Sequence, residues 1–82
     1  MVLGVLGILL SNRREQAPRV QEVLTKYGDL ILCRSGVHDP VKARGLITLT
    51  MEAAETEINA LTAELHDVSG VEVGIALLPE GQ

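Results

Sequence analysis

The chain is short, acidic and almost free of aromatic residues. Its 82 residues suffice for one small domain, and a formal net charge of −4 argues against nonspecific nucleic-acid binding, which requires basic side chains that neutralise phosphates. One Cys excludes an internal disulfide, and the absence of Trp and Phe leaves an aliphatic core. We therefore expect a single domain over residues 1–82.

The first ten residues predict a buried strand. Residues 2–10 are apolar without a break and rich in Val, Leu and Ile, which is typical of a central strand covered on both faces. No basic residue precedes this run, Arg13 and Arg14 follow it, and it is too short to span a bilayer, so neither a signal peptide nor a membrane helix is indicated. With the lone cysteine, this favours a cytoplasmic protein that does not contact membranes.

A helix is expected next. Apolar side chains recur at helical spacing at Ala17, Val20, Val23, Leu24 and Tyr27. Pro18 belongs in a first turn, which predicts a start near Glu15 or Gln16. Gly28 is a natural residue to follow the last helical turn, where left-handed backbone is common.

The remaining segments repeat this alternation of strand and helix. Residues 29–37 predict a second strand, residues 38–45 a charged loop, and residues 46–51 a third strand rich in β-branched side chains. Apolar positions within residues 54–68 step by three and four, which indicates an amphipathic helix. Residues 71–78 complete the pattern as a fourth strand.

The predicted order is therefore βαββαβ, an α+β ferredoxin-like fold with one four-stranded antiparallel sheet and both helices on one face. No helix is left to cover the second face. The first strand is apolar on both faces, with Val2, Leu6, Ile8 and Leu10 on one and Leu3, Val5 and Leu9 on the other, and either set could be the uncovered one. An exposed apolar face of this kind marks an interface. We expect a homo-oligomer, a dimer or a tetramer, that packs through this face or a sheet edge, where Gly4, Gly7 and Gly74 permit close approach.

Catalytic motifs are missing from the sequence. It contains no G-x-S-x-G, phosphate loop, H-E-x-x-H or C-x-x-C, so we expect no enzyme and no cofactor. His66 lies near a predicted helix end, and the carboxylates of the same helix form a solvated face. The strands carry no aromatic side chains on which RNA bases stack, and no basic stripe indicates DNA binding by this chain alone.

The stretches "NRREQAPRVQEVLTKYGDLILCRSGV" and "INALTAELHDVSGVEV" resemble the family of iron-only hydrogenase system regulators. The matching positions, which extend over nearly the whole chain, are Asn12-Arg13, Val20 to Leu24, Tyr27-Gly28, Arg34-x-Gly36, Ile58 to Thr62 and Gly70 to Val73. That family resembles ACT domains and the ligand-binding half of the nickel-responsive regulator. The resemblance implies an effector-sensing module that works as a dimer or tetramer.

The hairpin between the middle strands departs from the family pattern. A Gly-Ile-Pro or Gly-Leu-Pro turn is common in the family, whereas Gly36-Val37-His38-Asp39-Pro40 and a longer run to Gly45 stand here. Long loops in small domains are usually functional or mobile. We expect residues 36–45 to form a lid over a pocket or an arm that reaches another subunit.

Cys33 and His38 both lie in residues 33–40, at the junction of the second strand and this loop. Three interpretations of the pair stay open: a metal site, an ordinary strand end, or a small-molecule pocket that includes His38. Five extended residues span roughly 16 Å, so a shared metal requires the loop to fold back or a second subunit to contribute. Alternation places Cys33 on the same face as Ile31 and Ser35. We predict no metal site.

An effector site is expected near the first strand-to-helix loop, as the resemblance to ACT domains implies. N–H groups at the helix start, with Arg14, would favour an anion such as a carboxylate. The alternative is that Asn12 caps the helix and the arginines are solvated. The predicted ligand-binding residues are Asn12, Arg13, Arg14, Arg34, Gly36 and His38.

Two functional hypotheses emerge from these observations. The first is a non-catalytic sensing domain that oligomerises and binds a small anionic effector at subunit interfaces. The alternative is a pure oligomerisation or protein-interaction module without a ligand. An acylphosphatase-like hydrolase is a weaker third possibility, because Asn12 and Arg13 are present but the Gly-rich phosphate cradle is not.

Overall fold

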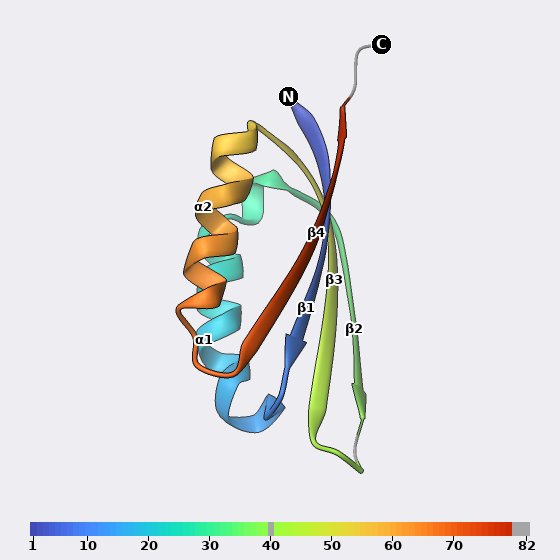
Figure 1. Ribbon diagram of the computed structural model, residues 1–82, viewed down its shortest axis with the longest axis vertical. Helices are drawn as coiled ribbons and strands as arrows, with labels where there is room; N and C mark the ends of the chain where they lie inside the picture. Colours follow the sequence, from blue (N-terminus) through green and yellow to red (C-terminus); the bar gives the residue numbers. More distant parts are fainter. Residues whose placement is uncertain (40, 80–82) are drawn as a thin grey trace.

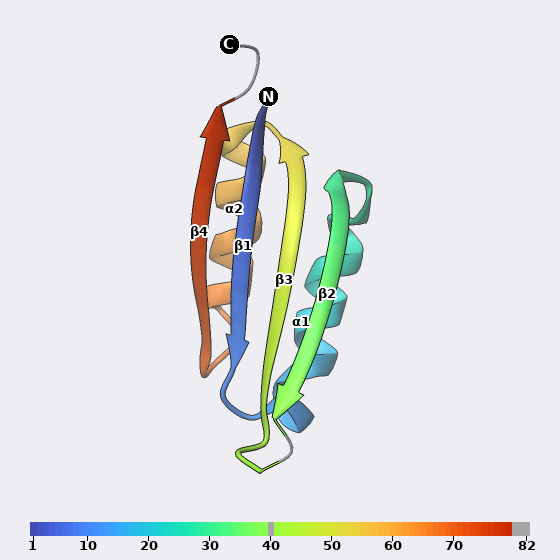
Figure 2. The same ribbon diagram turned by 90° about the vertical axis from the view of Figure 1, so that its right-hand side faces the viewer.

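The computed structural model describes residues 1–39 and 41–79 and has the predicted βαββαβ order. Its elements are β1 (Val2–Leu10), α1 (Arg13–Lys26), a 3₁₀ turn (Gly28–Leu30), β2 (Ile31–Asp39), β3 (Arg44–Ala53), α2 (Glu55–His66) and β4 (Val71–Pro79). The strands form one antiparallel sheet in the order β2-β3-β1-β4. Both helices cover the same face of this sheet (Figure 1), and Figure 2 shows the opposite face uncovered. The ferredoxin-like fold is confirmed.

The hydrophobic core fills the space between the sheet and the two helices. β1 lies in the centre and pairs with β3 and β4 in unbroken register, which explains its continuous apolar sequence. The fully buried side chains include Leu6 and Ile8 of β1, Leu49 and Met51 of β3, Val20 of α1, and Ile58, Leu61 and Leu65 of α2. Neither helix of the described residues is long and apolar enough to cross a membrane.

We call the opposite side of the sheet the bare face. Its residues, in strand order, are Cys33, Ser35 and Val37 of β2, Leu46, Thr48, Thr50 and Glu52 of β3, Leu3, Val5, Gly7 and Leu9 of β1, and Glu72, Gly74, Ala76 and Leu78 of β4. No other described element packs on it. The bare face therefore exposes large apolar side chains at its two ends, Leu9, Leu46 and Val37 together at one end and Leu78 at the other.

The glycines differ in the spaces they occupy. Gly7 and Gly74 are partners across β1 and β4, and both have open space where a side chain would point on the bare face. Gly4 instead faces the helices, where an added Cβ would lie 3.0 Å from Cδ1 of Ile58. The expectation that Gly4 permits approach by another subunit is therefore wrong, because its missing side chain admits Ile58 into the core.

The first helix begins earlier than predicted and ends differently. Asn12 is its N-cap, so α1 starts at Arg13 and Pro18 lies in the second turn, where its missing N–H removes one helical hydrogen bond. Gly28 begins the 3₁₀ turn and does not adopt left-handed backbone. Among the described glycines, only Gly70 has a positive φ, 81°, in the turn after α2.

The hairpin between β2 and β3 is much tighter than the sequence suggested. Strand pairing continues through His38 with Gly45 and Asp39 with Arg44, which leaves residues 40–43 as the connection. The Asp39 carboxylate accepts hydrogen bonds from the N–H groups of Val41 (3.0 Å) and Lys42 (3.3 Å) and so holds the turn. The prediction of a ten-residue loop is wrong for the described part of this segment, whereas its role as a lid or an intersubunit arm stays a prediction; Pro40 lies outside the described residues.

A β-bulge at the start of β2 changes the face assignments of that strand. Ile31 pairs with Met51 on the helix side, whereas Cys33 pairs with Thr50 on the bare face, because the register shifts at Leu32. The prediction that Cys33 shares a face with Ile31 is therefore wrong. Beyond the bulge the strand alternates regularly, with Arg34, Gly36 and His38 on the helix side.

Candidate functional site

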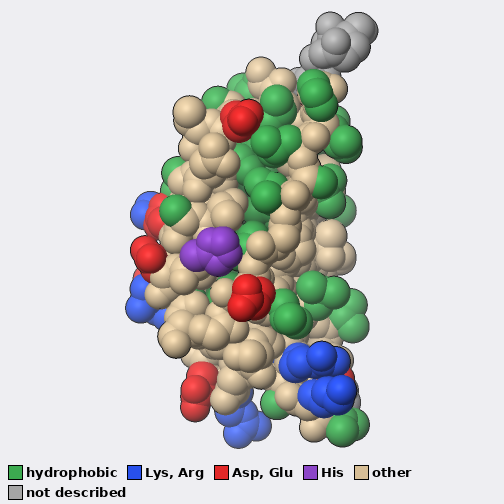
Figure 3. Space-filling view, in the orientation of Figure 1, with side chains coloured by type: hydrophobic (Ala, Val, Ile, Leu, Met, Phe, Trp, Pro, Cys, Tyr) green, Lys and Arg blue, Asp and Glu red, His purple; other side chains and the backbone are tan. Residues whose placement is uncertain are grey.

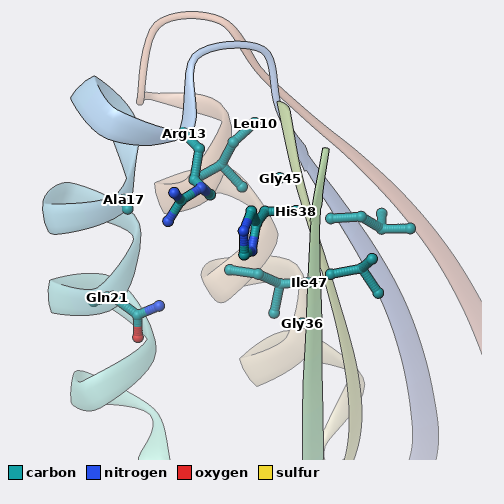
Figure 4. Close-up of a pocket in the computed structure, with 10 residues that line it drawn as sticks. Leu10, Arg13, Ala17, Gln21, Gly36, His38, Gly45 and Ile47 are labelled. Atoms are coloured by element: carbon teal, nitrogen blue, oxygen red, sulfur yellow. The ribbon is translucent and has the colours of Figure 1, made fainter. Parts of the chain in front are cut away.

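A small pocket lies between the first half of α1 and the ends of β2 and β3 (Figure 4). Its volume is about 180 Å³. Its lining residues are Leu10, Arg13, Ala17, Gln21, Gly36, Val37, His38, Gly45, Leu46 and Ile47. Three of the six predicted ligand-binding residues, Arg13, Gly36 and His38, therefore meet here although they come from different elements.

The pocket wall at Arg13 is held by the hairpin. The N–H of Arg13 donates to the carbonyl of Ala43 at 2.9 Å, which ties the start of α1 to the β2–β3 turn. The aliphatic part of the Arg13 side chain packs on Gly45, since an added Cβ there would lie 3.1 Å from both Cγ and Cδ. These contacts leave the guanidinium on the pocket side together with the His38 ring (Figure 4).

A second hollow of about 430 Å³ opens beside the first. Its lining residues are Asn12, Arg13, Arg14, His38, Asp39 and Ala43. Asp39 is the only carboxylate among them, and it is engaged: the N–H of Lys42, the Arg44 guanidinium and the N–H of Val41 hold its pKa below the usual value. Neither Arg13 nor Arg14 forms an ion pair with any described residue. The free charges of the two hollows are therefore positive.

The helix start offers fewer free N–H groups than the sequence suggested. The N–H of Arg13 is used by Ala43, and the N–H of Glu15 points at the Asn12 side chain at 3.4 Å, which confirms the capping role of Asn12. Within the described chain, only Arg14 of these first three helical residues keeps an N–H without a protein acceptor. Recognition of an anion would therefore depend mainly on the arginine side chains and His38.

Gln16 is a structural residue of this region that sequence reasoning missed. Its buried side chain accepts from the N–H of Asn12 (2.9 Å) and donates to Oγ of Ser11 (3.1 Å) and to the carbonyl of Ser69 (2.7 Å). It thus ties the β1–α1 loop to the turn before β4. Gln16 lies four residues before Val20 and so belongs to the buried stripe of α1. A polar residue at such a position is the feature of the sequence that could have revealed its role.

Arg34 and Cys33 lie apart from the His38 pocket. Nη2 of Arg34 donates to Oε1 of Gln21 at 2.6 Å, and both Arg34 and Cys33 line a third hollow of about 340 Å³ near the end of α1. Cys33 is on the bare face and His38 on the helix side, so one chain cannot bring both to the same ion. Among the described residues, no three His, Cys, Asp or Glu side chains form a cluster suited to a metal.

Comparison with known proteins identifies a family and a similar structure over nearly the full length of the chain. The family model TM1266-like, described as an iron-only hydrogenase system regulator, matches residues 2–74. The structure of the uncharacterized protein TM1266 from Thermotoga maritima is similar with a TM-score of 0.89 and 27% sequence identity, over 94% of this chain and 96% of that chain. No curated protein matches the chain.

Formyltetrahydrofolate deformylases show a more distant likeness. The enzyme from Burkholderia mallei has a TM-score of 0.67 at 17% identity, and the enzyme from Pseudomonas putida 0.66 at 14%. The matches cover 89% and 90% of this chain but only 27% and 28% of the two enzymes. At such identity the likeness concerns the fold alone, and the activity of those enzymes does not transfer to this chain.

Proposed function

Because the chain belongs to the TM1266-like family of iron-only hydrogenase system regulators, we propose that it is a non-catalytic sensing domain that assembles with copies of itself and binds a small anionic effector. Family membership supports the regulatory role. The assembly and the effector are inferred from the bare face and from the pocket between α1 and β2.

The observation that carries the effector proposal is the convergence of Arg13 and His38 on one pocket. Two hollows share these side chains, and the single carboxylate nearby is already engaged by the hairpin. The floor beneath them is apolar, with Ala17 and Ile47 among the lining residues. At about 180 Å³ the pocket is smaller than the roughly 300–1,000 Å³ of drug-sized sites. A carboxylate on a short apolar group fits this combination of charge, floor and size.

The observation that carries the assembly proposal is the apolar character of the bare face. Leu46 is 44% exposed there, and Leu9 and Val37 are exposed beside it. Contiguous exposed apolar side chains on a small domain are typical of an interface. The location of the effector pocket at one end of the sheet is compatible with contributions from a second copy, as in the ACT domains that the family resembles.

The alternative function is a pure oligomerisation or interaction module. One observation favours it: the first N–H groups of α1 are mostly engaged within the chain, so the helix start is not an empty anion site. In that case Arg13 serves mainly to cover Gly45 and anchor the hairpin.

Thermal-shift measurements with small carboxylates, amino acids and inorganic phosphate separate the two functions. A ligand at about 100 times its Kd stabilises the folded state by about 2.7 kcal/mol, which raises the Tm by several degrees. We expect this rise in the native protein and in Arg19→Gln, an exposed control on the same helix. Arg13→Gln and His38→Gln should lose it. If the protein assembles but no compound in these classes raises its Tm, the interaction module is the better description.

A further inference from the structure

The two edges of the sheet differ in how well they are protected against pairing. The β2 edge carries the bulge at Leu32 and, beyond it, the charged or polar residues Arg34, His38 and Asp39. Bulges and charges of this kind prevent an edge strand from pairing with another chain. The β2 edge is therefore poorly suited to extend the sheet.

The β4 edge has fewer of these protections. All nine residues from Val71 to Pro79 pair with β1 without a register shift, Glu72 is the only charge, and Pro79 stands at the very end. Figure 2 shows β4 at the border of the sheet, and no other described element lies outside it. Long, regular, apolar edges such as this one are templates for pairing with another strand.

Apolar side chains along β4 are also left uncovered on the helix side. Ile75 faces the helices and pairs with Leu6, which is fully buried, yet Ile75 itself is 42% exposed because α2 does not extend past the edge. On the bare face of the same strand, Leu78 is 52% exposed. Figure 3 looks onto this edge and shows hydrophobic side chains gathered along β4, between α2 and the sheet.

We propose that β4 pairs in antiparallel orientation with β4 of a second copy, which joins the two sheets into one continuous sheet with all helices on one face. A twofold axis at Ile75 places Ile75 beside its own copy and Val73 beside Leu77 of the other chain, so the uncovered apolar row closes on itself. The same axis places Glu72 opposite Leu78. The two Glu72 carboxylates then lie about six residues, or roughly 20 Å, apart and do not repel each other strongly.

This inference rests on the proposed self-assembly and assigns it a surface. The β4 edge and the bare face are different surfaces of one domain, so their use together gives a tetramer, whereas either alone gives a dimer. The partner of the β4 edge is a second copy of this chain, because β4 is complementary to itself in length, in apolar pattern and in the spacing of its single charge.

Light scattering on Ile75→Lys tests the pairing directly. The partly exposed position tolerates lysine in a folded domain, but a symmetric pair would bring two lysines together. We expect Ile75→Lys to halve the mass of the native assembly. Leu32→Lys also replaces an aliphatic side chain by lysine, at a position that is 61% exposed on the β2 edge, and it should leave the mass unchanged. An unchanged mass for Ile75→Lys overturns the proposal.

A bare-face variant separates this inference from self-assembly in general. If Leu46→Lys lowers the mass and Ile75→Lys does not, the chain assembles but not through β4. A native protein that is monomeric at micromolar concentration overturns both the self-assembly and the pairing, and leaves effector binding to be judged by the thermal-shift experiment.

Hydrogen exchange supplies a test that does not depend on a variant remaining folded. Alternate N–H groups of an edge strand point away from its sheet and exchange quickly unless another strand pairs with them. We expect these amides in β4 of the native protein to exchange more slowly than those of β2, and to lose that protection on dilution. Equally fast exchange at both edges contradicts the β4 pairing.

Discussion

Replacing Gln16 by methionine removes three hydrogen bonds while nearly preserving the length of the side chain. The amide is 8% exposed and joins the N–H of Asn12, the hydroxyl of Ser11 and the carbonyl of Ser69. A hydrogen bond contributes about 0.5–1.5 kcal/mol net to folding. In the variant, the exposed Ser11 hydroxyl and Ser69 carbonyl can form hydrogen bonds to water instead. We therefore take a value in the lower part of the range for three hydrogen bonds together, about 2 kcal/mol. For a domain of this size, that corresponds to a fall in Tm of roughly 8–16 °C.

The assay is urea unfolding followed by far-ultraviolet circular dichroism, at one protein concentration because self-association affects apparent stability. Arg19→Met introduces the same side chain at an exposed position of the same helix and should change the unfolding free energy by less than about 0.5 kcal/mol. If Gln16→Met is no less stable than Arg19→Met, the buried amide does not hold the β1–α1 loop to the turn before β4, and the reasoning fails.

Three further predictions concern other regions. Gly70→Ala should lower the unfolding free energy by at least about 1–2 kcal/mol, since φ is 81° and the new Cβ would collide with the side-chain amide nitrogen of Gln16. Gly28→Ala, where the space is open, should lower it little. The pKa of the Glu64 carboxyl is held below its usual value, first by its hydrogen bond from Lys26. The ionised Glu64 carboxyl therefore stabilises the fold above the usual carboxyl pKa, and this stabilisation is lost as pH falls through the lowered pKa of Glu64. The unfolding free energy of Glu64→Gln should consequently fall less steeply in acid than that of the native protein, and identical profiles would contradict this. Leu46→Lys on the bare face should dissociate copies held by that face, as a lower mass in light scattering, without unfolding the domain.

Much of the fold is predictable from local patterns in the sequence. The apolar run of β1 indicates a central strand, and the three- and four-residue steps of α2 indicate which side of that helix is buried. The order of the elements then leaves few arrangements. The uncovered sheet face is predictable from the same patterns, because the sequence predicts two helices, the described residues contain these two, and both crossovers place them on one side.

The second strand shows where local patterns mislead. Its charged residues resemble a loop, yet His38 and Asp39 pair with β3, because an edge strand needs only backbone partners and exposes much of both its sides. The single extra residue at Leu32 reverses the faces of the later residues in the strand, since side chains alternate with a period of two. Neither the strand pairing of His38 and Asp39 nor the bulge at Leu32 can be recognised from the amino-acid composition of the segment.

The sequence by itself determined the class of fold, the two helices, the apolar second face and the residue types suited to an anion. The tertiary structure alone decided which of those residues meet: Arg13 comes to His38 because it packs on Gly45 and bonds to Ala43. The structure also revealed the side-chain hydrogen bonds of Gln16 and the weakly protected β4 edge. These features depend on contacts between segments distant in the chain, whereas periodicity reports only which side of each element is buried.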